Sequence, residues 1–372
     1  MAQPAFPGRL GKKTAASPQA GPAARGTQNT TTGGGYCIIE IVSDPELVVV
    51  WRITEHCDLG CGFCAYSRHL RRARPSANPD QVLAFGALLK DHAATYRRNV
   101  LVSWLGGEPL RWPPLFEISR AFKHKFNLRL GVTTNGTALK SGSIRRHLVE
   151  DFDQLTISVD GFGAFHDQCR DAPGLFEQLR LSLLSLREMK NSLGRGPLFR
   201  VNTVLMRDNI HAFEELCRTL AEWGVEELTF NALGGRDRPE FFPDHRLLPE
   251  QVEWFRETLP DIRARAAQSG LKILGSERYL DRIHNWSLNL QSPISDCHPG
   301  QQFLFIDERG LVAPCSFTLH DYGVHLSEIR APRDLAQLPA RLAERKRAKM
   351  SAPCFDCPST QVFGKFEPAI KL

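Results

Sequence analysis

The 372-residue sequence has no uninterrupted apolar run of the roughly 18 residues that a membrane-spanning helix needs, and it has no recognisable signal peptide. The first absence excludes an integral membrane protein. The second counts against export, and therefore against disulfide bonds as the role of its ten cysteines. With 42% hydrophobic and 24% charged residues, the composition is that of a soluble globular protein, which we expect in the cytoplasm.

Basic residues exceed acidic ones mainly in the first 35 residues, which hold four basic side chains and no acidic one. The formal net charge of the chain is +6, so the remainder carries only +2. No basic stripe interleaved with aromatic residues is present, which gives little support to a nucleic-acid partner. An Arg-rich stretch at 68–74 could grip an anionic substrate or an acidic electron donor such as flavodoxin or ferredoxin, or form a solvated face like the one expected at 341–349.

The chain divides by composition and periodicity. Residues 1–35 are rich in Ala, Gly, Pro and Thr and predict a disordered tail. After residue 45, six β-branched apolar runs alternate with segments of helical periodicity, which predicts an α/β fold with a parallel sheet. The expected strands lie at 48–54, 99–105, 128–134, 154–160, 199–205 and 227–232. The expected helices lie at 79–98, 114–126, 141–150, 174–193, 211–223 and 249–269.

These elements predict a parallel sheet that is either open and doubly wound or curled towards a barrel, and in both cases chemistry belongs at the carboxyl ends of the strands. A bridging helical segment is expected at 241–290. Residues 291–372 then change to a short hairpin and a basic helix at 334–349. This stretch has too few apolar residues for a core of its own, so we expect a separate small module stapled by a metal or a cross-link.

Three cysteines, Cys57, Cys61 and Cys64, follow the first expected strand with the spacing C-x3-C-x2-C. Three thiolates bind three irons of a cubane cluster and leave the fourth iron open for substrate or cofactor. A zinc site completed by His56 or by a distant ligand is an alternative, as are three merely buried thiols.

A second motif, Gly106-Gly107-Glu108, ends the second expected strand. Paired glycines allow another backbone to approach closely, and a carboxylate on this face could accept charge-assisted hydrogen bonds from a ligand ammonium. A Gly-Gly turn before a helix is also common punctuation, so the position beside the cysteine loop is what makes the motif informative.

The two motifs together resemble the radical S-adenosylmethionine (SAM) superfamily, whose cluster motif is C-x3-C-x-aromatic-C and whose second strand ends in G-G-E. The resemblance implies that residues 45–240 form a partial (β/α)6 TIM-like barrel and that the three cysteines hold a 4Fe–4S cluster that chelates SAM. It also implies an enzyme in which one-electron reduction of SAM yields a 5′-deoxyadenosyl radical that abstracts a substrate hydrogen atom. The cofactor-binding positions that it implies are Phe63, Gly106, Gly107, Glu108, Ser158 and Asn202.

Further resemblance narrows the subgroup. The segment 160–170, with its D-G…H-D-x-x-R pattern, looks like the relatives that carry SPASM or twitch extensions. A complete SPASM domain would have further cysteines after the C-terminal C-x2-C pair, and this sequence has none. The resemblance therefore implies a twitch-like module with one auxiliary 4Fe–4S cluster, whose ligands are Cys297, Cys315, Cys354 and Cys357. A structural zinc site would fit the same four residues.

The substrate is less constrained. Asp160, Cys169 and Arg236 are candidate catalytic residues, and each could equally be structural. About 45 residues precede the barrel, too few for the winged-helix module of many peptide-modifying relatives. This favours a small-molecule substrate, or a peptide that a separate protein recognises. A SPASM-type peptide or protein maturase and a non-catalytic zinc-binding scaffold are the alternatives. A nucleic-acid-modifying enzyme rests only on the Arg-rich stretches.

Overall fold

Seven consecutive parallel strands form the main sheet of the computed structural model, which describes residues 46–294, 297–357 and 359–360. The predicted tail at 1–35 lies outside these residues. The strands are β1 (Leu47–Thr54), β2 (Val100–Gly106), β3 (Arg129–Thr134), β4 (Gln154–Ser158), β5 (Leu198–Leu205), β6 (Glu227–Ala232) and β7 (Lys272–Ile273). Every neighbouring pair from β1 to β7 is parallel, so the predicted α/β class with a TIM-like sheet is confirmed.

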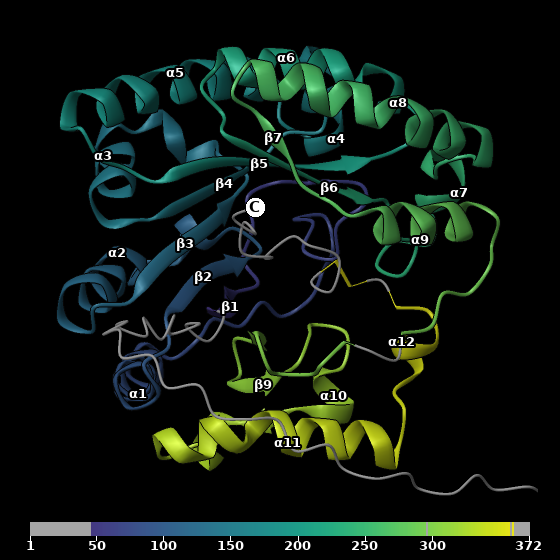
Figure 1. Ribbon diagram of the computed structural model, residues 1–372. Coiled ribbons are helices and arrows are strands. Elements are labelled where there is room, and N and C mark those ends of the chain that lie inside the picture. The colour runs from purple at the N-terminus through teal and green to yellow at the C-terminus, as the bar shows by residue number, and fades with distance from the viewer. Residues whose placement is uncertain (1–45, 295–296, 358, 361–372) are drawn as a thin grey trace, which may run out of the picture. The chain divides into compact units, whose positions relative to one another are not determined.

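Helices connect the strands, and Figure 1 shows α5, α6 and α8 along the outer side of β4 to β7. The first of them, α1, begins where the sequence supplies a cap: Asn78 accepts hydrogen bonds from the backbone of residues 80 and 81, and Pro79 opens the helix. The helices of this part are α1 (Pro79–Tyr96), α2 (Leu115–Arg120), α3 (Gly142–Asp151), α4 (Gly163–Arg170), α5 (Leu175–Leu193), α6 (Phe213–Glu222), α7 (Phe242–His245), α8 (Pro249–Gln268) and α9 (Glu277–Ser287).

Strand β1 is buried on both faces, as a central parallel strand must be. Trp51 packs in the main core, where its ring lies 6.0 Å from that of Trp104. The alternate residues Val48 and Val50 belong to a smaller apolar cluster with Phe305 on the other face. The continuous apolar run at the start of the barrel therefore serves two cores.

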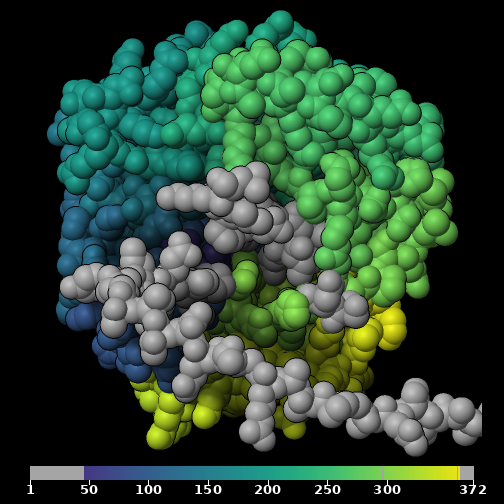
Figure 2. All heavy atoms as spheres, in the orientation of Figure 1, coloured from purple at the N-terminus to yellow at the C-terminus, as the bar shows by residue number. Residues whose placement is uncertain are grey.

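The C-terminal segment shares this second core with β1, and the small twitch-like module that the sequence predicts for it stays a prediction. Strand β8 (Phe303–Ile306) pairs in parallel with β1, and β9 (Leu311–Ala313) and β10 (Val324–His325) extend the same sheet antiparallel. The remaining helices are α10 (Leu319–Tyr322), α11 (Pro332–Ala348) and α12 (Ala352–Phe355). In Figure 2 the yellow-green and yellow atoms of this segment lie directly against the barrel residues.

Three elements differ from the expectations for physical reasons. Strand β7 was not expected because two residues make no periodic pattern. Helix α4 follows β4 in a segment for which no helix was expected. The helix expected at 114–126 is divided, because a π-helical turn at Ala121–Lys125 follows α2. Within the described residues, no helix combines the length and apolarity needed to cross a membrane.

Candidate active site

The cysteine loop lies directly after β1, at the carboxyl edge of the sheet. The backbone amide of Leu59 donates to Cys57 Sγ at 3.5 Å, and that of Tyr66 donates to Cys64 Sγ at 3.4 Å. Amides that point at sulfur stabilise thiolates and tune iron–sulfur clusters. All three cysteines of the loop are free thiols, and burial raises the pKa of Cys57 to about 12 and that of Cys61 to about 11.

The raised pKa values mean that these thiols ionise only when a cation takes the place of the proton, as iron does on binding. The donor set, three thiols with amides directed at two of them, therefore fits a 4Fe–4S cluster with one open iron. In the part of the chain that the structure describes, no three His, Cys, Asp or Glu side chains converge closely enough to hold a single metal ion.

The loop is tied to the end of β3 through Asp58. Asn135 Nδ2 donates to Asp58 Oδ1 at 2.9 Å, and Thr137 Oγ1 donates to Asp58 Oδ2 at 2.8 Å. The Asn135 amide also lies 3.8 Å from Cys57 Sγ. These contacts join residues 77 to 79 positions apart, so no local pattern in the sequence reveals them.

Most of the Arg-rich stretch at 68–74 stabilises the same loop. The half-buried guanidinium of Arg74 donates to four backbone carbonyls between residues 55 and 70. Arg68 donates to the carbonyl of Asp58 and pairs with Asp171, and Arg72 pairs with Glu55 at 3.1 Å. Substrate or partner contacts of these three arginines stay predictions, and each already has a structural role.

Gly106 and Gly107 lie against the chain that leads into the cysteine loop. The amide of Gly107 donates to the carbonyl of Thr54 at 2.8 Å, and the amide of Glu108 donates to that of His56 at 2.7 Å. A Cβ on Gly106 would lie 2.7 Å from the Thr54 oxygen, and one on Gly107 would press into the His56 oxygen. The glycines thus allow two backbones to touch immediately before Cys57.

Glu108 is fully buried, with both carboxylate oxygens engaged. Oε1 accepts from Thr134 Oγ1 at 2.7 Å and from the amide of Leu110 at 3.0 Å, while Oε2 accepts from the amide of Asn135 at 2.7 Å. Burial nevertheless raises its pKa to about 7. Glu108 therefore joins the ends of β2 and β3. Its contact with the ammonium of SAM stays a prediction, and Oε2 has the acceptor capacity for such a contact because it accepts one hydrogen bond from the protein.

Two more predicted cofactor-binding residues face each other on adjacent strands. Ser158 ends β4 and is paired in register with Asn202 of β5. Asn202 Oδ1 accepts from Thr229 Oγ1 at 2.9 Å and from Asn231 Nδ2 at 2.8 Å, both on β6. The structure thus brings both residues to the carboxyl half of the sheet, as expected of cofactor contacts, and their contact with SAM stays a prediction.

Asp160 and Arg170 form a buried ion pair beside the cysteine loop. Two nitrogens of Arg170 lie 2.7 Å from Asp160 Oδ2, and the amide of Val204 donates to Oδ1 at 2.9 Å. The guanidinium also lies 5.3 Å from the centre of the Phe63 ring, within the cysteine loop. Asp160 has no exposed surface, so its contacts support the position of Arg170 and the loop.

A cavity of about 700 Å³ opens at the carboxyl ends of β5 and β6, bounded by α7, α9 and the C-terminal segment. Phe63 and Arg236 line it, whereas Asp160 and Cys169 are not among its lining residues. Burial raises the pKa of Cys169 to about 12, so that thiol stays protonated. Of the three catalytic candidates, only Arg236 is among the residues that line this cavity, and its contact with a substrate stays a prediction.

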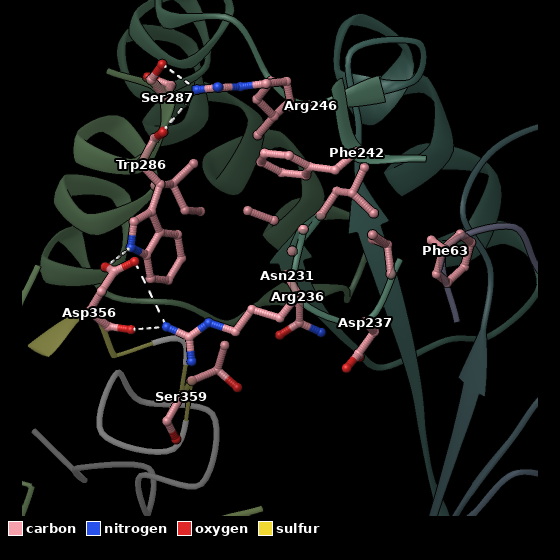
Figure 3. A pocket seen from close by; sticks show the side chains of 18 of the residues that line it. Phe63, Asn231, Arg236, Asp237, Phe242, Arg246, Trp286, Ser287, Asp356 and Ser359 are labelled. Atoms are coloured by element: carbon pink, nitrogen blue, oxygen red, sulfur yellow. Dashed lines mark hydrogen bonds and ion pairs between the residues drawn. The ribbon is translucent and has the colours of Figure 1, made fainter. Parts of the chain in front are cut away.

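Figure 3 shows Arg236 reaching across the cavity to Asp356, while Trp286 stands beside them. Trp286 Nε1 donates to Asp356 Oδ1 at 2.7 Å, and the Arg236 guanidinium lies 3.8 Å from Oδ2. Asp356 sits between Cys354 and Cys357 in the sequence. Asp356 therefore belongs both to the cavity wall and to the Cys354–Cys357 segment. No local sequence pattern indicates its contacts with Trp286 and Arg236, because the three residues are far apart in the chain.

The four C-terminal cysteines lie near one another. Burial, with smaller contributions from the neighbouring thiols of Cys315 and Cys354, raises the pKa of Cys357 to about 11. Cys297 in turn adds to the raised pKa of Cys354, which burial dominates. All four are free, so the donor set fits the closed four-cysteine site that the sequence predicts, and their role as ligands stays a prediction.

Comparison with known proteins identifies the superfamily. Residues 51–220 match the family described as the radical SAM superfamily. The AdoMet-dependent heme synthase of Nitratidesulfovibrio vulgaris is 25% identical over 316 residues, which cover 81% of this chain and 80% of that protein.

Solved structures show the same fold. The structure of native anSMEcpe with bound AdoMet aligns with a TM-score of 0.59 at 16% identity, over 87% of this chain and 90% of that one. Streptococcus suis SuiB bound to precursor peptide SuiA aligns with a TM-score of 0.55 at 16% identity, over 73% of this chain and 60% of that one.

These similarities confirm the family resemblance carried by the cysteine and Gly-Gly-Glu motifs. They also confirm the predicted cofactors at the level of the superfamily, a 4Fe–4S cluster and SAM, while the ligand residues stay predictions. Residues 51–220 are a radical SAM domain, and the protein that carries this domain is an enzyme.

Proposed function

We propose that this enzyme cleaves SAM reductively at a 4Fe–4S cluster held by Cys57, Cys61 and Cys64, and that the 5′-deoxyadenosyl radical takes a hydrogen atom from a substrate in the cavity. The observation that carries the proposal is the position of Phe63, which belongs to the cysteine loop and also lines the cavity. Cluster loop and substrate space are therefore adjacent, as a short-lived radical requires. When bound, the cluster supplies the electron that breaks the sulfonium bond.

The chain's own residues position and enclose this chemistry. Gly106 and Gly107 let the loop close against β2, and Asp58 anchors it to β3. We expect Ser158 and Asn202, which are paired in register on β4 and β5, to contact the bound cofactor. We expect Arg236 to contact the substrate, and its position in the cavity wall beside Asp356 supports this role.

A second, auxiliary 4Fe–4S cluster on Cys297, Cys315, Cys354 and Cys357 belongs to the same proposal. Four thiolates close such a site, so it binds no substrate directly. Its proximity to the cavity through Asp356 suits a role in electron transfer with the substrate. A one-electron reductant such as flavodoxin or ferredoxin completes the proposal.

For the substrate we propose a small molecule, with a tetrapyrrole as the leading candidate. The cavity volume of about 700 Å³ falls within the range of small-molecule sites, roughly 300–1,000 Å³. Its walls carry the aromatic residues Phe63, Phe242 and Trp286, which suit a flat ring. The relative from N. vulgaris is named a heme synthase, which supports this choice. A peptide is the second candidate, because the similar SuiB structure has a precursor peptide bound.

The reaction is tested by anaerobic reconstitution with iron and sulfide, followed by reduction with dithionite in the presence of SAM. We expect 5′-deoxyadenosine and methionine in equal amounts, and neither product without dithionite. A protein that takes up zinc in place of iron and leaves SAM intact would instead support the non-catalytic scaffold.

The substrate class is tested by titrating the protein with hemin as a tetrapyrrole probe and following tryptophan fluorescence. We expect saturable quenching that largely disappears in Trp286→Phe, because Trp286 lines the cavity. Trp254→Phe is the matched control, since that half-buried indole packs against His211 and does not line the cavity. Equal quenching in both variants, with 5′-deoxyadenosine formation stimulated only by a peptide, would favour the second candidate.

A further inference from the structure

A lysine approaches one of the four C-terminal cysteines. Lys346, on the last turns of α11, places its Nζ 3.1 Å from Cys297 Sγ and 3.4 Å from the carbonyl oxygen of Ile294. The sequence predicts a solvated basic face at 341–349, and the structure corrects this expectation for part of it. Arg347 is exposed, but Lys346 is half-buried and faces the cysteines.

Two of the other cysteines have hydroxyl neighbours. Thr318 Oγ1 lies 3.3 Å from Cys315 Sγ, and the hydroxyl of Tyr322 lies 3.9 Å from Cys354 Sγ. Both hydroxyl groups are neutral, so Lys346 is the charged group among these three sulfur contacts.

Among the residues that the structure describes, another cation and two acids lie near the cysteines. The guanidinium of Arg282 donates to the carbonyl of Cys357 at 3.2 Å. Asp356 is paired with Trp286 Nε1 and with a guanidinium across the cavity, and Asp321 accepts from the hydroxyl of Ser351. These two acids have partners of their own, and Lys346 brings its ammonium within 3.1 Å of the Cys297 sulfur.

We propose that Lys346 is a positioning residue that raises the reduction potential of the auxiliary cluster, by placing its ammonium against the Cys297 thiolate. The inference rests on the four-cysteine site of the proposed function. Reduction adds a negative charge to a cluster, and a nearby cation stabilises the reduced form more than the oxidised one. A cluster with a raised reduction potential accepts an electron more readily than it donates one. The proposal therefore predicts that electrons move from the substrate to the auxiliary cluster.

The test uses the full-length chain with Cys57, Cys61 and Cys64 changed to alanine, so that the auxiliary site alone is loaded. Iron is counted first, and the midpoint potential is then measured by titration followed with electron paramagnetic resonance. In Lys346→Gln we expect the equilibrium constant for reduction to fall about tenfold, which for a one-electron couple equals about 59 mV. Lys346→Arg keeps a cation and should restore most of the potential.

Arg347→Gln is the matched control, because it removes the same charge from an exposed position on the neighbouring residue. Its potential should equal that of the parent. Equal potentials in Lys346→Gln and Arg347→Gln, with iron unchanged, would overturn the role of Lys346 and leave the proposed cluster intact. A parent that retains no iron would remove the auxiliary site itself, and with it this inference.

Discussion

Gly107→Ala should abolish reductive cleavage of SAM, with a fall of about 100-fold or more in the rate of 5′-deoxyadenosine formation. The added Cβ would lie 2.7 Å from the carbonyl oxygen of Glu55 and closer still to that of His56. Both obstacles are backbone atoms, so the clash is relieved only by moving the segment that leads into Cys57. Cleavage and iron content are measured on the same preparations.

Gly142→Ala provides the control for that substitution. A Cβ at Gly142 would meet only the flexible end of Arg145, at 3.7 Å, and the residue opens helix α3. We expect wild-type cleavage and iron content in this variant. Full activity in Gly107→Ala would show that the contact between β2 and the cysteine loop does not position the cluster.

Arg170→Met should destabilise the protein strongly, by roughly 3–5 kcal/mol, because it leaves the carboxylate of Asp160 buried without its partner. The Asp160 side chain has no exposed surface, and the Arg170 side chain is 9% exposed. The substitution also removes the cation beside the Phe63 ring, so the cysteine loop should loosen. Urea unfolding of the iron-free protein measures the loss.

The double variant Asp160→Asn with Arg170→Met should recover part of the lost stability, since no unpaired charge then remains in the interior. Arg180→Met breaks an exposed pair with Glu177 and should change the unfolding midpoint far less. A single Arg170→Met variant as stable as Arg180→Met would contradict the account of the pair as a buried support of the loop.

The sequence predicted the parallel strands well, because strands buried on both faces are continuous apolar runs. Strand β6 was expected at its observed bounds, and β1 and β5 each begin one residue earlier than expected. Short elements escaped prediction, as β7 did with two residues. The joining of β8 to β1 escaped it too, because pairing between residues about 250 positions apart leaves no local pattern.

For the site, spacing predicted the cysteine sets and the Gly-Gly-Glu turn, since their geometry is local. The supports of the site depend on contacts between distant segments, such as Asp58 with Asn135 or Trp286 with Asp356. An aspartate or a tryptophan has many uses, and the sequence alone does not single these out. The contact of Lys346 with Cys297 could not be predicted either, because the side chains of a basic helix usually face solvent.

The central claim is that this chain holds two iron–sulfur clusters, one of them open to SAM. The most direct measurement counts iron and sulfide per chain after anaerobic reconstitution of the wild type, of the Cys57/Cys61/Cys64→Ala variant and of Cys217→Ala. Cys217 is buried in α6, away from both cysteine sets, and serves as the control. We predict about eight irons in the wild type and in Cys217→Ala, and about four in the triple variant, which makes no 5′-deoxyadenosine. Equal iron in all three proteins, or zinc in place of iron, would contradict the claim.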